Sequence, residues 1–334
     1  MKKIIVPLIL LLSLPLIFKS TPTEILKLKT FDYLIKTPEP SGNFTILNIT
    51  EEDIEREGGY PLPRERLADI QLEILGKGAL GVGWVISFPQ ADRLGGDSRF
   101  AASLGYAPSV LATFETPNGN YPKTTGTVIK GSNVGGLSVS GVKENYTAYD
   151  NILQGIAIAP VEVDQLVRRI PLLLKTPDGW SASFGTQVLK ILTNTPTYII
   201  TTNNNGIQEI AVRGLPPVKT DSLGRKWVSW VNTSETNLQE MNVNGKFVFV
   251  GVTANGVMPQ VATPVGLLEP HKIQAALAES ILIQNSPYIP DWALAVELVT
   301  LLVTVTLVWF LLFYLGITWG LVLGVLTASV TALG

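Results

Sequence analysis

The sequence predicts an α/β fold: a single extracytoplasmic domain with a mixed, largely parallel sheet flanked by helices, plus transmembrane helices at both ends. Three observations predict it. Short β-prone apolar runs alternate with amphipathic stretches of helical period across residues 20–290, which is typical of strands joined by crossover helices. Residues 1–19 place two lysines before a fifteen-residue apolar run. From Trp292 to Gly334, Glu297 is the only charged residue.

The end of the chain is long enough for two membrane crossings. Roughly 20 apolar residues cross the hydrocarbon core as a helix. We therefore predict a transmembrane helix at 291–315 and a second one at 316–334, with the small residue Gly316 at the turn between them. One long buried helix of a soluble protein is the alternative. Such a helix normally carries a polar stripe, and this stretch has none.

Residues 1–19 have the length of a membrane anchor or of a signal peptide. Residues 18–22, where the apolar run ends, lack an Ala-x-Ala-like cleavage site, so we favour an uncleaved transmembrane anchor. In both cases Lys2 and Lys3 stay in the cytoplasm. Residues 20–290 are then exported, as the periplasmic or extracellular part of a bacterial inner-membrane protein. Gly334 would end on the outer face, so we expect the sequence to be truncated before a further crossing.

Composition excludes several classes of function. The net charge is −2, which argues against nucleic acid as a partner. Cys is absent, so disulfides, thiol chemistry and thiolate metal sites are excluded. His271 is the only histidine, and no Gly-x-Ser-x-Gly elbow supplies a nucleophile for it. We therefore predict no catalytic centre, no metal site and no cofactor in these residues, and interpret His271 as a surface or helix-start residue.

The elements follow one another without a linker, which favours one domain over two. Helices are expected at 26–35, 63–76, 98–104, 181–192 and 274–283, and strands at 44–49, 80–87, 109–114, 155–160, 198–202, 207–212, 227–231 and 247–252. The turn at 203–206 ends in Asn-Gly, which supplies the positive φ of a tight hairpin. The Gly/Ser/Thr-rich stretch 121–142 is interpreted as hairpins or a loop on the sheet rim.

Two glycine- and acid-rich stretches resemble ligand motifs only superficially. Residues 76–81 have the Gly-x-Gly-x-x-Gly spacing, but they end a helix and open a strand, whereas a dinucleotide site needs the opposite order. We interpret them as a helix C-cap. The acidic stretch 50–57 would suit a cation, although a solvated helix face is favoured.

Two charged clusters leave alternatives open. Asp92 and Asp97 would hold a cation around their loop, or Asp97 would cap the following helix, and we favour the cap. The pair Arg168-Arg169 would grip an anion in a bidentate manner, or would form exposed pairs on the rim, and we favour the rim.

Several stretches together resemble the bacterial CHASE family, second type, an extracellular sensory domain associated with cyclases and histidine kinases. Residues 59–64 are similar to the entry to the family's first helix. The resemblance continues along most of 24–290, through 82–84, 88–93, 97–104, 164–172, 221–227, 246–256 and 263–264. Val85, Thr50 and Met258-Pro259 stand where the family has acidic residues.

The resemblance implies a sensory input region of a membrane-bound signalling receptor. We expect it to respond to an extracytoplasmic ligand or protein and to control a nucleotide cyclase or protein kinase beyond Gly334. A homodimer is expected because such outputs work as pairs. Glu297 would be a coupling residue, or would take an interfacial position near Trp292 with little consequence, and the sequence leaves both alternatives open. The alternative is a membrane-tethered structural or interaction protein without an attached output domain.

Ligand-binding residues are expected on loops at the carboxyl ends of the strands, where open α/β sheets bind ligands. Arg64 is expected to hold these loops together. The candidates are Arg64, Asp92, Arg93, Asp97, Thr253, Asn255 and Thr263.

Overall fold

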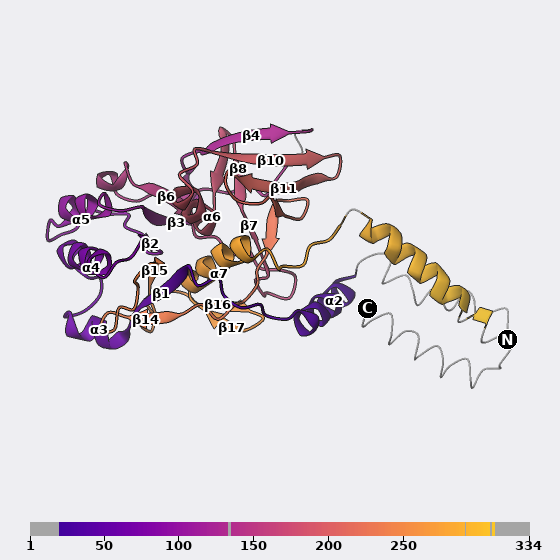
Figure 1. The fold of residues 1–334 in the computed structure, drawn as a ribbon, viewed down its shortest axis with the longest axis horizontal. Coiled ribbons are helices and arrows are strands. Elements are labelled where there is room, and N and C mark those ends of the chain that lie inside the picture. The colour runs from indigo at the N-terminus through magenta and orange to yellow at the C-terminus, as the bar shows by residue number, and fades with distance from the viewer. Residues whose placement is uncertain (1–19, 133–134, 291, 308, 311–334) are drawn as a thin grey trace. The chain divides into compact units, whose positions relative to one another are not determined.

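The computed structural model describes residues 20–132, 135–290, 292–307 and 309–310 (Figure 1). Contacts divide the chain into two units. The core unit is Thr37–Tyr288, and the terminal unit joins the residues up to Lys36 to those from Ile289 on. Each unit is described by itself.

The core unit is built on a seven-stranded sheet with the order β14-β1-β15-β2-β3-β5 and with β6 paired to β3. Every pair in it is parallel except β3–β5, which confirms the predicted mixed, largely parallel sheet. Its strands are β1 (Phe44–Ile49), β2 (Gly81–Trp84), β3 (Ser109–Asn120), β5 (Val142–Lys143), β6 (Leu153–Ile156), β14 (Glu235–Asn237) and β15 (Phe247–Val252).

Both faces of this sheet are covered, which explains the near-continuous apolar sequence of its central strands. In β15 all six residues are buried. Phe247 and Phe249 pack into one apolar cluster, whereas Val248 and Val250 pack into the other.

The helices divide between these two clusters. One cluster contains residues of α4 (Arg64–Gly76) and α5 (Asp97–Leu104), and the other contains residues of α6 (Phe184–Leu192) and α7 (Pro270–Ile283). Gly78, with φ at +87°, follows the end of α4, so the 76–81 glycines do terminate a helix. Helix α7 begins earlier than predicted because Pro270 occupies its first turn, where a missing N–H is tolerated.

Smaller sheets and helices complete the core unit. The Asn-Gly hairpin is confirmed as β10 (Thr197–Asn203) with β11 (Gly206–Val212). The stretch 121–142 supplies β4 (Gly126–Lys130), an edge strand that pairs with β10 and so does not form a hairpin of its own. The remaining elements are β12 (Val218–Lys219), β7 (Arg169–Pro171), β13 (Arg225–Trp227), β8 (Leu173–Thr176), β9 (Gly179–Ala182), β16 (Val261–Thr263), β17 (Gly266–Leu268), α3 (Glu51–Arg56) and the 3-10 turn η1 (Thr147–Tyr149).

Some predicted strand bounds shift by a few residues. The strand expected at 155–160 is β6, Leu153–Ile156, and the one expected at 227–231 is β13, Arg225–Trp227. Residues 181 and 182, expected in a helix, end β9 instead.

Of the two arginines of the 164–172 motif, Arg168 is buried and Arg169 is partly buried, which corrects their interpretation as exposed rim residues. Arg168 is 0% exposed and forms two 2.8 Å bonds to the carboxylate of Asp164. Arg169 bonds to Glu162 at 2.7 Å through two nitrogens and lies near Asp221. These pairs neutralise charges where β7 meets β13, so they serve the fold.

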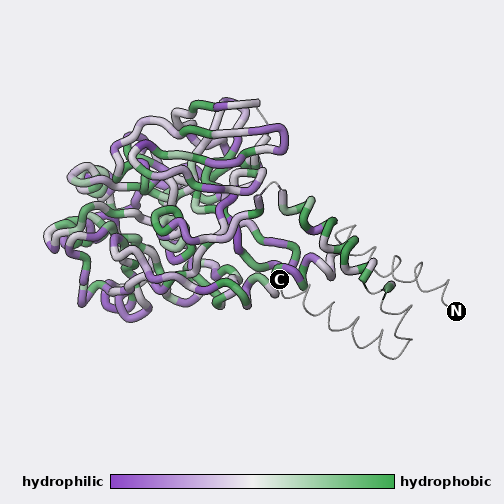
Figure 2. The backbone as a smooth tube through the Cα atoms, turned by 45° about the vertical axis from the view of Figure 1, so that its right-hand side comes forward, coloured by the Kyte–Doolittle hydropathy of each residue, from purple (hydrophilic) through white to green (hydrophobic). Residues whose placement is uncertain are grey.

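The terminal unit contains α2 (Thr21–Leu34) and a helix over 293–307. Lys27 and Glu297 form a 2.7 Å ion pair, so the one charge of the tail has a partner in α2. Figure 2 shows the mostly apolar character of the tail helix. Within the part of the chain that the structure describes, no helix combines the length and the apolarity of a membrane span. The predicted helices at 1–19 and 316–334 lie outside the described residues, as does part of 291–315.

Replacing Arg168 by Met tests the buried pair. The change leaves the Asp164 carboxylate buried without its cation, so we expect a loss of about 3–5 kcal/mol in unfolding free energy, measured by urea unfolding. Arg213 is exposed, and Arg213→Met is the matched control, expected to stay within about 0.5 kcal/mol of the parent. Equal unfolding midpoints for the two variants would contradict a stabilising role for the pair.

Candidate ligand pocket at the carboxyl edge of the sheet

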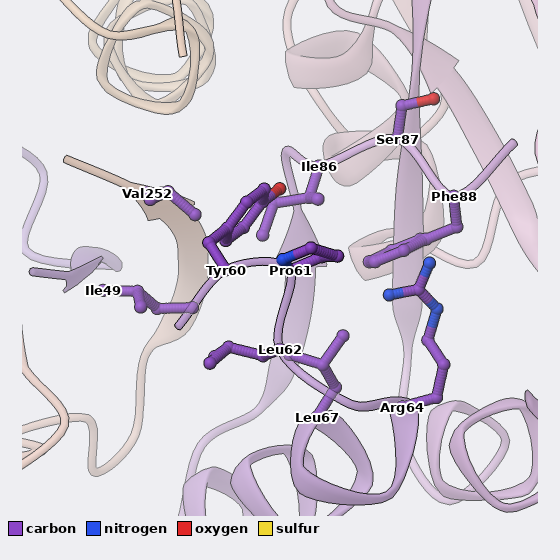
Figure 3. Close-up of a pocket in the computed structure, with 10 residues that line it drawn as sticks. All are labelled: Ile49, Tyr60, Pro61, Leu62, Arg64, Leu67, Ile86, Ser87, Phe88 and Val252. Atoms are coloured by element: carbon purple, nitrogen blue, oxygen red, sulfur yellow. The ribbon is translucent and has the colours of Figure 1, made fainter. Parts of the chain in front are cut away.

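A pocket lies where three parallel strands end together. Ile49 of β1 is in register with Val252 of β15, and Val250 is in register with Trp84 of β2. The carboxyl ends therefore meet at one edge, which is where open α/β sheets bind ligands. Figure 3 shows the residues that line the pocket. They are Ile49, Tyr60, Pro61, Leu62, Arg64, Leu67, Ile86, Ser87, Phe88 and Val252.

One wall is the connection from α3 to α4, residues 58–63, which we call the strap. It starts with two consecutive glycines at positive φ, Gly58 at +86° and Gly59 at +120°, a conformation that other residues rarely adopt. Tyr60 is 43% exposed, whereas Leu62 is buried. The strap thus presents apolar groups to the pocket and keeps one aromatic ring partly in solvent.

Arg64 is the cationic group of the pocket. It begins α4, and its guanidinium lies 4.5 Å from the centre of the Phe88 ring. Its Nε lies 3.8 Å from Oδ1 of Asp97, an ion pair too long for a hydrogen bond. Nε is buried and has no hydrogen-bond partner among the residues that the structure describes. Nε is therefore a buried donor without an acceptor among the described residues, and the nearest charge to it is the Asp97 carboxylate.

Asp97 does not cap α5 but bonds to the loop before this helix and to Tyr149. The residue before the helix is Gly96, and no side chain caps it. Oδ2 of Asp97 accepts the Asp92 N–H at 2.7 Å, and Oδ1 accepts the Tyr149 hydroxyl at 2.6 Å. The prediction of Asp97 as the helix N-cap is therefore wrong, because its carboxylate turns back to the preceding loop and across to η1.

Asp92 performs the capping role, but for α4. Its Oδ2 accepts the Arg64 N–H at 2.9 Å, at a helix start where Pro63 has no side chain for the purpose. Burial opposes ionisation of Asp92, but bonds from backbone N–H groups, that of Arg64 first, outweigh it and lower its pKa. Burial and the bond to Asp97 raise the pKa of Tyr149, which stays a neutral donor.

The other predicted site residues lie apart from this cluster. Arg93 is in the same loop but exposed. The Thr253 N–H donates to the Ile49 carbonyl at 3.0 Å, and the Asn255 N–H donates to Glu51 at 2.9 Å, so both residues hold strand ends. Thr263 closes the β16–β17 hairpin through its hydroxyl and the Gly266 carbonyl, at 2.7 Å.

The described residues contain no group of three or more acidic or histidine side chains that is placed to hold a metal ion. The acidic stretch 50–57 is the helix α3, opened by a capping box between Thr50 and Asp53.

Of the residues that line the pocket, the sequence predicted Arg64 alone, and it did not predict Tyr149, which binds Asp97 beside the pocket. Tyr60 and Phe88 lie in stretches that carry the family resemblance, so their position was available as a signal. Tyr149 carries none, because only the fold brings η1 beside α5.

The pocket is small. Its volume is about 40 Å³, whereas a single water needs roughly 10–15 Å³ by the same measure. It accommodates about three water-sized groups.

The start of α7 reaches the same edge of the sheet. Nε2 of His271 lies 2.8 Å from Oδ1 of Asn48, whose amide nitrogen donates to Glu235 at 2.6 Å. This arrangement orients the Asn48 oxygen toward the ring, so Nε2 carries the proton. His271 is 1% exposed, and burial lowers its pKa to about 3. It begins a helix, as expected, but is not on the surface. A side chain at Gly251 would collide with its ring.

The end of α7 binds the chain segment before β1 directly and is linked to the segment after α7 through Ser229. Glu279 is 0% exposed, and its Oε2 accepts the N–H of Ser41, in the segment that precedes β1, at 2.9 Å. Ser280 accepts the Ser229 N–H at 2.8 Å. The Ser229 hydroxyl in turn lies 2.9 Å from that of Ser286, in the segment that follows α7.

Comparison with known proteins gives one match. A family model described as the CHASE2 domain matches residues 6–315. No curated protein and no solved structure matches the chain.

The Asp92 cap makes a pH-dependent contribution to stability. Because its folded pKa is lowered, the contribution is present above the ordinary Asp pKa of about 4 and is lost as pH falls through the folded value. We expect Asp92→Ala to lose about 1 kcal/mol at pH 7 and the difference from the parent to shrink in acid, in unfolding measured at several pH values. Asp178→Ala, at an exposed position, is the control. A loss that is the same at every pH would show that the carboxylate charge is not what matters.

Proposed function

The chain belongs to the CHASE2 domain family of extracellular sensory domains found in signalling receptors, and we propose that it is the ligand-responsive input region of a membrane-bound bacterial receptor. In this proposal the pocket is the sensing site. Residues 1–19, 291–315 and 316–334 are the membrane helices, and residues 20–290 face the periplasm or the exterior. The receptor works as a homodimer and controls a cytoplasmic nucleotide cyclase or protein kinase.

The observation that carries the proposal is that α7 makes specific contacts at both of its ends. Its first turn packs on Asn48 and Gly251, which directly precede the pocket residues Ile49 and Val252 on their strands. Its last turns hold the segment before β1 directly, through Glu279, and the segment after α7 through Ser229. Fourteen residues of helix span about 21 Å. One rigid element therefore connects the pocket edge with both chain segments that continue into the terminal unit.

The buried groups along α7 make this connection specific. His271 is enclosed between Asn48 and Gly251, and Glu279 is enclosed against Ser41. A packed helix transmits a displacement because interiors are close-packed and resist deformation. A ligand shifts such an element only through a difference in its affinity for two arrangements. The proposal thus requires that α7 has two positions, of which the occupied pocket favours one.

Lys27 and Glu297 extend the proposal into the terminal unit. Their ion pair joins α2 to the tail helix, so the two segments that leave the core unit are linked again near the expected membrane boundary. In solvent such an exposed pair contributes about 0–1 kcal/mol. We assign Glu297 a coupling role on this basis, with Lys27 as its partner.

Replacing Glu279 by Ala tests the connection in the full-length protein in native membranes. Without the carboxylate the Ser41 amide loses its acceptor, so we expect hydrogen exchange at residues 37–43 to accelerate at least about tenfold, while β1 stays protected. The basal cyclase or kinase output should change several-fold. Glu240 is exposed, and Glu240→Ala is the matched control. Faster exchange with unchanged output would show that α7 holds the segment without carrying a signal, and would favour a tethered interaction protein.

A further inference from the structure

We propose that the outer edge of β4 (Gly126–Lys130) pairs with the same strand of a second copy of the chain, antiparallel and centred on Val128. The two four-stranded sheets would then form one continuous sheet. The inference rests on the proposed function, because it names the surface through which the proposed homodimer forms. Four features lead to it: an open sheet edge, the absence of the usual edge protection, apolar side chains on both faces and a self-complementary register.

The first feature is the open edge. β4 is the last strand of the sheet β12-β11-β10-β4, and within the described residues it forms a ladder with β10 only. The bridge from Thr125 to Trp180 lies before the strand begins. Figure 1 shows β4 at the margin of the core unit, above β10. An edge strand presents unpaired backbone N–H and C=O groups, which are a template for a further strand.

The second feature is that this edge lacks the usual protection. Natural sheets blunt their edges with short strands and charged side chains. The other strands that end the order of the two larger sheets, β14, β5 and β12, have two or three residues, and each contains Glu or Lys. β6, which lies off this order, is partly or fully buried. β4 has five residues, and its one charge, Lys130, stands at its end.

The third feature is the apolar surface on both faces of the edge. Val128 is 49% exposed and Ile129 is 36% exposed, and successive side chains of a strand point to opposite faces. Ile129 is in register with Ile200 of β10, which is fully buried. The covered face of the sheet therefore continues as far as β4 and ends there on a partly exposed isoleucine. A further strand at this edge would cover Ile129 on one face and Val128 on the other.

The fourth feature is the register, which points to a second copy as the occupant. In an antiparallel pair centred on Val128, this residue faces its own copy, and Thr127 faces Ile129 of the second copy. Such β-branched residues are enriched in strands, and apolar pairs across strands stabilise a sheet. Lys130 then faces Gly126, so no like charges meet. In a parallel pair in register, Lys130 would face Lys130, which is destabilising.

The size of the contact suits a sensor. A standard stable interface engages roughly 20–30 residues a side, whereas β4 offers five. Two copies in one membrane meet at a high effective concentration, which allows so small a contact to form and to come apart. A change of state requires a contact of this reversible kind, because a ligand shifts an equilibrium only between arrangements that are both accessible.

A single thiol at the centre of the strand tests the inference in the full-length protein in native membranes. The 334 residues contain no Cys, so Val128→Cys introduces the only thiol among them. Directly opposed residues of antiparallel strands have Cα atoms about 4.5–5.5 Å apart, within the range of a disulfide. We expect mild oxidation to convert at least ten times more of this variant into a disulfide-linked dimer than of Val265→Cys. Val265 is 57% exposed between β16 and β17 and is the matched control, and the parent gives the background.

Three results would overturn the inference. These are equal dimer yields for the two variants, a mixed disulfide with a different protein in place of the dimer, and a protein that dimerises without linking at position 128.

Further variants check the register and keep the test open should Val128→Cys not fold. Thr127→Cys and Ile129→Cys, expressed together with different tags, should link to each other several-fold more than either links to itself. Adding Val128→Lys to both copies places two ammonium groups face to face and should reduce this link at least tenfold. Adding Val265→Lys should leave it unchanged. A link that Val128→Lys does not weaken, or that forms equally within each variant, would also overturn the inference.

The linkage is read without any output assay, so this inference and the proposed function fail separately. A dimer held by the disulfide at position 128 whose cyclase or kinase output equals that of the parent would count against the proposed function and leave the interface standing. Absence of the disulfide in a protein that still controls its output would remove the interface and leave the proposed function.

Discussion

The insertion of β15 between β1 and β2 is the constraint on which the rest of the structure depends. This strand comes late in the sequence, yet it pairs in parallel with two early strands. Its continuous apolar sequence allows it to occupy the sheet centre, where both faces are buried. The insertion brings Val252 beside Ile49 and so creates the pocket edge. It also places Gly251 under His271, which docks α7 at that edge.

The polar residues at this edge are used mainly to build it. Asp92 accepts the Arg64 N–H at the start of α4, a group that would otherwise have no partner. Asp97 joins the loop before α5 to Tyr149. Such buried polar groups are stable only when each acceptor and donor is paired. Two groups at this edge depart from that rule, because Nε of Arg64 and the Ser87 hydroxyl are buried without a partner among the described residues.

The sequence predicted the fold class well because the pattern of apolar strands and amphipathic helices is local. The bounds of β1 and β15 match the prediction. It did not predict strand order, since the position of β15 follows from packing across the whole domain. Arg168-Arg169 were interpreted as exposed because charged residues usually are. Ion pairs with Asp164 and Glu162 instead allow Arg168 to be buried and Arg169 to be partly buried. The site was found in part: Arg64, Asp92 and Asp97 meet, but the role of Asp97 was wrong because Tyr149 had no sequence signal.

The central claim is that α7 connects the pocket with both segments that leave the core unit. Hydrogen exchange of the full-length protein, in the parent and in Val252→Ile, which adds one carbon to the pocket wall, tests it most directly. The account predicts that this change at the pocket alters exchange at residues 37–43 and 284–288, at the far end of α7, as well as at the strap. A change confined to the strap and the pocket walls, with the far end unaffected, would contradict it.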